Sequence, residues 1–230
     1  LEEDLPPPPG EEAKGPSFAE RAAVMRPALD RLRADIVCFQ EVHGQERPNA
    51  DRDILALKAL LAGTRLETFT LVSTMTTVGQ VYDKRNLVVA LRPGLTVEEV
   101  RQINGDVTPN PSYRRAIAND PEAKPVRWER PLQYVRVGLP GGGTLHVLNA
   151  HFKSKIAVRA TEQMVNRYTW SSAAAWAEGY FLSSMKRVGA AIEARQVIDG
   201  IFAQDRDAAV VIAGDFNADS QEVPVMALRG

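Results

Sequence analysis

Apolar positions along this chain follow two different spacings. Helical spacing predicts a helix from the Ser17–Glu20 capping box to Leu32, a second over 51–61 and a third over 170–204. Short apolar runs predict strands at 36–42, 68–73, 86–91, 132–139, 144–150 and 208–213. We expect Pro27 to kink or restart the first helix, residues 104–125 to form a loop, and Pro140–Gly143 to close a hairpin. This irregular alternation indicates an α/β layered domain with a mixed sheet.

Composition narrows the class of protein. The chain has 230 residues, 44% hydrophobic and 25% charged, which is typical of globular domains. Its net charge of −1 argues against a polybasic nucleic-acid-binding tail but leaves a local basic groove open. The single cysteine, Cys38, excludes an intrachain disulfide and a Cys-rich zinc site, and its apolar neighbours place it in the core.

The ends of the chain affect localisation and domain organisation. Residues 1–16 are rich in proline and are expected to form a loop or mobile arm of a single domain over 1–230. No apolar stretch reaches the roughly 18 residues that a transmembrane helix needs. Because the first residue is Leu1 rather than Met, a signal peptide cannot be judged, and both a cytoplasmic and a secreted location stay open. We favour a monomer.

Polar clusters stand where three of the predicted strands end. They contain Glu41, then Asn149 and His151, then Asp215 and Asn217. Each has a structural explanation by itself: a salt bridge for Glu41, a hydrogen-bonded His151, and an Asx turn for the last pair. Because strand ends of layered α/β folds gather into one crevice, we expect these side chains to converge. Carboxylate, amide and imidazole groups without cysteine suit Mg²⁺ or Mn²⁺ and phosphoryl chemistry.

Basic residues flank these clusters in sequence and favour an anionic substrate. They are Arg127, Arg130, His151, Lys153, Lys155 and Arg159. Arg130 precedes Pro131 at the start of a predicted strand, a position that could aim its guanidinium into the crevice. The two lysines directly after His151 favour a polyanionic backbone.

Specific sequence runs carry a family resemblance. ADIVCFQEV (34–42), NLVVAL (86–91), ERPLQYVRV (129–137), LNAHFKSK (148–155) and VVIAGDFNADS (210–220) resemble the endonuclease/exonuclease/phosphatase superfamily, the deoxyribonuclease-I-like group. The resemblance implies a four-layer α/β sandwich, in which two packed mixed β-sheets have helices outside. It also implies Mg²⁺-dependent hydrolysis of phosphate esters, mostly phosphodiesters.

The same resemblance implies roles for individual residues. Glu41 would bind the metal, with Asp215 as the second residue of the metal site, and Asp215 would position and deprotonate the attacking water. His151 would stabilise the transition state or act as the acid, with Asn149 supporting its strand end and Asp83 orienting its ring. The phosphate would be held by Arg130 and Asn217. Lys153 and Lys155 are further substrate-binding candidates, predicted from their position after His151 rather than from the resemblance.

The resemblance leaves the substrate and the activity of this chain open. The family's first-strand Asn and last-strand Asp–His pair have no match here, so we expect a fragment with weak metal affinity that is inactive by itself. A nuclease acting on DNA or RNA is favoured over a phosphatase or phospholipase-type enzyme acting on phosphoinositides or sphingolipids. A non-catalytic binding module is the third alternative. Neither 104–125 nor 156–168, the segments that would decide the substrate, has an exposed aromatic pair suited to lipid surfaces. Trp170 and Trp176 are expected in the core or a lid.

Overall fold

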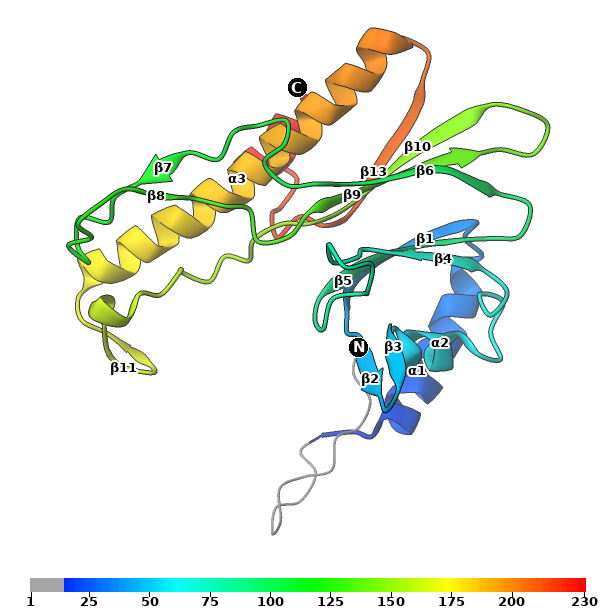
Figure 1. Ribbon diagram of the computed structural model, residues 1–230, viewed down its shortest axis with the longest axis horizontal. Helices are drawn as coiled ribbons and strands as arrows, with labels where there is room; N and C mark the ends of the chain where they lie inside the picture. The colour runs from blue at the N-terminus through cyan, green and yellow to red at the C-terminus, as the bar shows by residue number, and fades with distance from the viewer. Residues whose placement is uncertain (1–14) are drawn as a thin grey trace. The chain divides into compact units, whose positions relative to one another are not determined.

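The chain divides into two compact units in the computed structural model, which describes residues 15–230 (Figure 1). Unit 1 consists of Leu1–Val97 and Gly138–Gly143, and unit 2 consists of Glu98–Val137 and Thr144–Gly230. Most of the arm predicted over 1–16 lies outside the described residues. The prediction of a single domain over the whole chain stays a prediction.

Unit 1 is built on a three-stranded sheet with the order β1-β5-β4. The strands are β1 (Ile36–Val42), β5 (Asn86–Leu91) and β4 (Thr70–Ser73), and β5 pairs antiparallel with both neighbours. Every residue of β5 is buried, as expected of a central strand in a continuous apolar run. The predicted strands therefore form, with β4 two residues shorter than expected at its start.

Two helices cover the apolar residues of unit 1. The capping box at Ser17 and Glu20 is present and begins α1 (Phe18–Leu32), which runs through Pro27 as one helix, so the predicted restart there is wrong. Helix α2 (Leu55–Leu61) is shorter than predicted. Its expected first turn instead forms a hairpin, because β3 (Ala50–Asp53) pairs with β2 (Gln45–Arg47).

Unit 2 contains a four-stranded sheet with the order β13-β10-β9-β6. Its strands are β6 (Thr96–Ile103), β9 (Leu132–Gly138), β10 (Thr144–His151) and β13 (Ala209–Asp215), the first of which begins in unit 1. The predicted hairpin joins β9 to β10, and the Leu139 N–H donates to the Gly143 carbonyl at 3.0 Å. Strands β10 and β13 are parallel. We did not predict β6, because its mostly exposed residues mix valines with charged side chains and form no apolar run.

A long helix, α3 (Ala173–Gln204), confirms the third predicted helix and packs with the short α4 (Val223–Arg229) in the core of unit 2. The predicted loop over 104–125 contains one small pairing, β7 (Ser112–Tyr113) with β8 (Lys124–Pro125). A second small pairing joins β11 (Met164–Asn166) to β12 (Thr169–Trp170), after the 3-10 helix η1 (Thr161–Gln163).

Two buried glutamates of α3 fix the loop that precedes β9. The Glu193 carboxylate accepts backbone N–H groups of Gly105 at 2.8 Å and Val107 at 3.1 Å. The Glu178 carboxylate accepts the backbone N–H of Ala116 at 2.6 Å and the hydroxyl of Tyr113 at 3.0 Å. A segment with little regular structure is therefore held along the helix by charge-assisted hydrogen bonds.

Several sheets and helices together confirm the predicted mixed α/β class. None of the helices in the described part of the chain has the length and apolar character that crossing a membrane requires.

Candidate active site

His151 and Asp215 face each other at the ends of two parallel strands. They are register partners at the last positions of β10 and β13, and the His151 Nε2 lies 3.6 Å from the Asp215 Oδ2. The imidazole is 6% exposed, whereas the carboxylate is 53% exposed. A solvent-exposed carboxylate next to a buried imidazole is suited to accepting and donating protons at the strand ends.

Gly214 allows these two strands to lie close together directly before the carboxylate. Its φ of 139° falls in the region that favours glycine, and a Cβ there would lie 1.9 Å from the Ala150 carbonyl oxygen. The glycine of the GDFN run is therefore required by backbone contact, and it places Asp215 opposite His151.

A tight turn holds Asp215 in place. The Asn217 N–H donates to the Asp215 Oδ1 at 2.8 Å, and Asn217 has a left-handed φ of 49°. The Asn217 side-chain amide donates to the Phe152 carbonyl at 3.0 Å, while the Phe152 N–H donates to the Asp215 carbonyl at 2.9 Å. Asn217 thus shapes the loop as an Asx turn and ties it to the end of β10.

Arg130 lines the same small pocket as His151. Trp128, Phe152 and the buried Glu193 also line this pocket, which lies entirely in unit 2. Asn149 lies deeper, is fully buried, and donates to the Gln133 Oε1 at 3.2 Å across the sheet. Arg130 therefore lies next to His151 at a pocket of only about 10 Å³, whereas Asn149 supports the strand.

The two lysines that follow His151 have different surroundings. Lys153 is buried, donates to the Ser154 Oγ at 2.9 Å and to the Ile156 carbonyl at 3.1 Å, and lies 3.9 Å from Glu129. Burial lowers its pKa below the ordinary value for lysine, against the opposing charge of Glu129. Lys155 is more exposed and pairs with Glu222 at 2.7 Å. The Lys153 ammonium therefore binds groups of its own loop.

Glu41 and Asp83 belong to unit 1, so their expected convergence with the residues of unit 2 stays a prediction. Glu41 has a φ of 54°, where the register of β1 against β5 shifts between Phe39 and Val42. A positive φ in a residue other than glycine or asparagine strains the backbone, and such strain is often found at functional sites. The Glu41 carboxylate is 46% exposed and lies 3.5 Å from the Arg85 Nε.

Asn86 is a positioning residue that the sequence did not reveal. It is fully buried, and its amide donates to the carbonyls of Val42 at 2.9 Å and Tyr82 at 2.8 Å. It therefore fixes both the strand end after Glu41 and the turn before Asp83. Its position at the start of a strand gave no signal beyond the common preference of asparagine for strand ends.

Glu41 is the residue that the sequence predicts to bind a metal, and a single carboxylate would require a hard cation with a shell rich in water. Mg²⁺ in enzymes is commonly bound through one or two carboxylates, with waters and substrate oxygens completing the octahedron. Within residues 15–230, no three His, Cys, Asp or Glu side chains are grouped so that they could hold a metal ion. A single exposed carboxylate such as Glu41 still fits the water-rich type of site.

Trp176 is not in the core, so that part of the expectation is wrong, and the alternative of a lid stays a prediction. Its side chain is 48% exposed, and its ring stacks on that of Tyr180, 5.3 Å away with an interplanar angle of 20°. The second tryptophan, Trp170, is half-buried and lies close to Gly179. An exposed aromatic pair is therefore present in unit 2.

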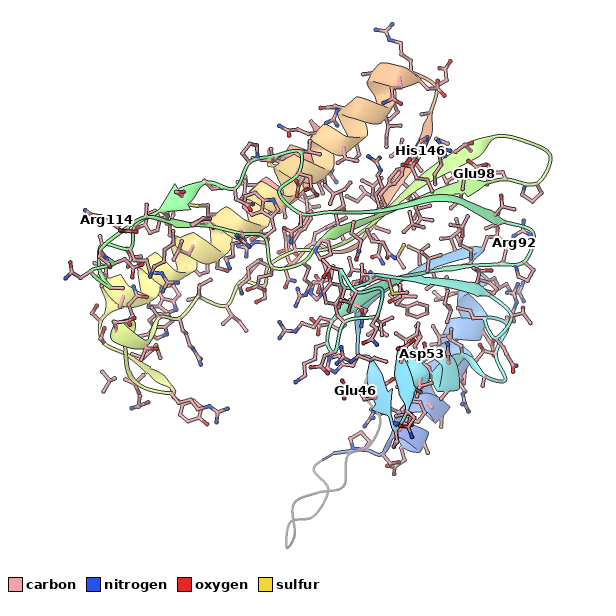
Figure 2. The ribbon with its side chains drawn as sticks, in the orientation of Figure 1. Glu46, Asp53, Arg92, Glu98, Arg114 and His146 are labelled. Carbon is pink, nitrogen blue, oxygen red and sulfur yellow. The ribbon has the colours of Figure 1, made fainter. Side chains whose placement is uncertain are left out.

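His146, labelled in Figure 2, also lies on β10 but near the start of the strand. Its Nδ1 lies 2.7 Å from the Tyr134 hydroxyl. Burial, together with the positive charge of Arg136, lowers its pKa below the ordinary value. It lies apart from the strand end that carries His151.

Solved structures of low sequence identity share this fold. The mannosyl-6-phosphatase Bt3783 of Bacteroides thetaiotaomicron has a TM-score of 0.52 and 10% identity, over 92% of this chain and 62% of that one. An endonuclease/exonuclease/phosphatase family protein of the same organism has a TM-score of 0.52 and 11% identity, over 92% and 60%. TDP2 of Caenorhabditis elegans has a TM-score of 0.50 and 16% identity, over 87% and 43%.

The chain therefore spans less than two thirds of the length of these structures. No curated protein matches its sequence. The model of one protein family matches residues 13–229, which is nearly the whole chain. By this match, together with the shared fold, the chain belongs to the endonuclease/exonuclease/phosphatase family.

Proposed function

We propose that this chain carries the active site of a Mg²⁺-dependent phosphodiesterase that acts on nucleic acid. The observation that supports this most strongly is the placement of Asp215 opposite His151 at the ends of two parallel strands. Membership of the family supports hydrolysis of phosphate esters in general.

The proposed reaction is attack of water on phosphorus. Asp215, whose carboxylate is half exposed, accepts a proton from the attacking water as the new P–O bond forms. The sheltered His151, in its protonated form, donates a proton to the leaving oxygen as the old P–O bond breaks. Arg130, which lines the pocket beside His151, holds a non-bridging phosphate oxygen.

Glu41 is the residue proposed to hold Mg²⁺. The bound cation would neutralise the negative charge that develops on the phosphate oxygens. The Arg85 guanidinium, 3.5 Å from the Glu41 carboxylate, would have to turn away or share this carboxylate with the metal.

A basic cavity in unit 2 supports a substrate with several phosphates. The cavity of about 440 Å³ lies among β7, β8, α3 and residues 158–162, and its basic side chains are Arg115, Lys124, Arg159 and Lys186. Two acidic side chains also line it, and one of them, Asp120, pairs with Lys124 at 3.2 Å. Arg114, labelled in Figure 2, is exposed next to β7. Excess positive charge in a cavity suits a phosphodiester backbone.

The test measures binding and turnover of a single-stranded oligonucleotide with Mn²⁺ or Mg²⁺. We expect Mn²⁺ to strengthen binding without being required for it. Because the sequence predicts a chain that is inactive by itself, we expect turnover to be at most very slow and to disappear in Asp215→Asn. The matched control is Asp207→Asn, an exposed carboxylate two residues before β13. Equal turnover in wild type and Asp215→Asn, prepared in parallel, would come from a contaminating nuclease and would contradict the proposal. Binding that neither the metal nor Asp215→Asn alters would favour the non-catalytic binding module instead.

The metal assignment has its own test. Glu41→Gln should weaken Mn²⁺ binding, measured by calorimetry, because it removes the anionic ligand while keeping the side-chain shape. Glu67→Gln, an exposed carboxylate elsewhere in unit 1, is the control. Unchanged Mn²⁺ affinity in Glu41→Gln would remove Glu41 from the proposed site.

A further inference from the structure

An exposed, stacked pair of aromatic rings lies on the first turns of α3. Trp176 is 48% exposed and Tyr180 is 38% exposed, and their ring centroids lie 5.3 Å apart at an interplanar angle of 20°. Four residues separate them, so they share one helix face. Ser172 caps this end of the helix, and its Oγ accepts the Ala175 N–H at 3.0 Å. The two rings are therefore held in place by regular helix geometry.

The chain that leaves the candidate active site runs alongside these rings. The Ser183 hydroxyl donates to the Ser154 carbonyl at 2.6 Å, and the Val158 N–H donates to the Gly179 carbonyl at 2.9 Å. Gly179 permits this approach, because a Cβ there would lie 2.5 Å from the Val158 carbonyl oxygen. Residues 154–158 thus connect the end of β10, with His151, to the helix segment that carries Tyr180.

Lys155 contacts the loop after β13 and lies near Tyr180. Its ammonium lies 2.7 Å from Glu222 and 3.9 Å from Asp219, in the loop that begins at Asp215. Its pKa is raised first by the hydrogen bond to Glu222 and, among smaller charge interactions, by the nearby Tyr180. Lys155 therefore contacts the active-site loop and lies near one ring of the pair, Tyr180.

We infer that Trp176 and Tyr180 form a platform on which an unpaired base of the substrate stacks. This inference rests on the proposed function and specifies its substrate as single-stranded nucleic acid. Base stacking on exposed aromatic rings tolerates any sequence, because every base has a π-face.

Charge on this part of unit 2 favours nucleic acid over a lipid surface. Glu222 and Asp219 neutralise the nearest lysine, which leaves little attraction for an anionic headgroup layer next to the rings. The excess basic charge instead lies in the cavity lined by Arg159 and Lys186, which is concave and suits a flexible phosphodiester chain. In this inference, the phosphates of the strand lie in the cavity and one base lies on the platform.

The experiment compares a labelled single-stranded oligonucleotide with an abasic backbone of the same length, by fluorescence anisotropy in EDTA. We expect the oligonucleotide to bind more tightly by about tenfold, which is a typical contribution of one stacked base. Trp176→Ala should remove this difference while the affinity for the abasic backbone is unchanged. Trp176→Phe should restore most of it, because a ring remains.

Tyr168→Ala is the matched control. Tyr168 is 78% exposed in the same unit, and its ring stacks on no other aromatic ring among the described residues. Its loss should leave both affinities unchanged. Equal binding of the two backbones by wild type, or an equal loss in Tyr168→Ala, would overturn the platform.

Two further outcomes separate the alternatives. The wild-type chain should not bind to vesicles of phosphatidylcholine and phosphatidylserine. Retention that depends on Trp176, together with equal binding of the two backbones, would assign the rings to a lipid surface and overturn the inference. Absence of binding to both backbones would contradict nucleic acid as the substrate itself, whereas equal binding to both would contradict the platform alone.

Discussion

Gly214 and Ala150 lie so close across the parallel strands β13 and β10 that no side chain fits between them. A Cβ on Gly214 would lie 1.9 Å from the Ala150 carbonyl oxygen and 3.0 Å from the Ala150 nitrogen. Because the next residue on each strand is Asp215 or His151, this contact fixes the spacing of the proposed catalytic pair. A change at Gly214 should therefore affect stability and chemistry together.

We predict that Gly214→Ala destabilises the chain and separates Asp215 from His151. Forcing a methyl group into closely packed backbone typically costs about 1–3 kcal/mol. Gly142→Ala is the control, because Gly142 also has a positive φ, 99°, but its Cβ would meet no atom within 4 Å. Urea unfolding of both variants measures the difference. Equal losses would show that backbone conformation alone, without the Ala150 contact, explains the need for glycine.

A second prediction concerns the buried Glu193. Glu193→Ala leaves the N–H groups of Gly105 and Val107 without their carboxylate, at a cost of about 1–3 kcal/mol. Hydrogen exchange at these two amides should become faster. Asp199→Ala is the control, because Asp199 is an exposed carboxylate of the same helix, paired with Arg195. Unchanged exchange at Gly105 in Glu193→Ala would contradict the tethering of this loop.

Short apolar runs made most of the fold predictable. Strands β1 and β5 have the predicted bounds because each contains a run of apolar residues, half-buried in β1 and fully buried in β5. Strand β6 and the hairpin of β2 and β3 escaped prediction, because these segments are mostly polar and their pairing depends on tertiary contacts. For the same reason, the helix predicted over 51–61 begins later in the structure, because its expected first turn belongs to that hairpin.

The candidate site was predictable only in part. The position of His151 and Asp215 at neighbouring strand ends follows from their place after apolar runs. The burial of Lys153 does not, since nothing local shows that its ammonium bonds to Ser154 and Ile156. Trp176 fits a helical pattern equally well whether it points inward or outward, so its exposure required the structure.

Burial raises the pKa of the Cys38 thiol from 9.0 to about 11, which predicts low reactivity at neutral pH. Alkylation by iodoacetamide should be slow in the folded chain and fast in urea. Since the folded pKa lies above the unfolded value, the linked stability is present below pH 9.0 and declines as the pH rises toward 11. Rapid alkylation of the native chain at neutral pH would contradict this.

The last prediction concerns the ion pair beside the proposed platform. The hydrogen bond from Lys155 holds the pKa of Glu222 below its ordinary value of 4.5, with help from the Asp219 backbone. A lowered carboxyl pKa means that the linked stability is present above pH 4.5 and is lost as the pH falls through the folded pKa. In Lys155→Gln, we expect the Glu222 titration midpoint, measured by carbon NMR, to move up toward 4.5. Lys124→Gln, which removes a lysine paired with Asp120, should leave it unchanged. The same midpoint in wild type and Lys155→Gln would mean that Lys155 does not hold Glu222 in solution, and that its charge is free for the phosphates of a substrate.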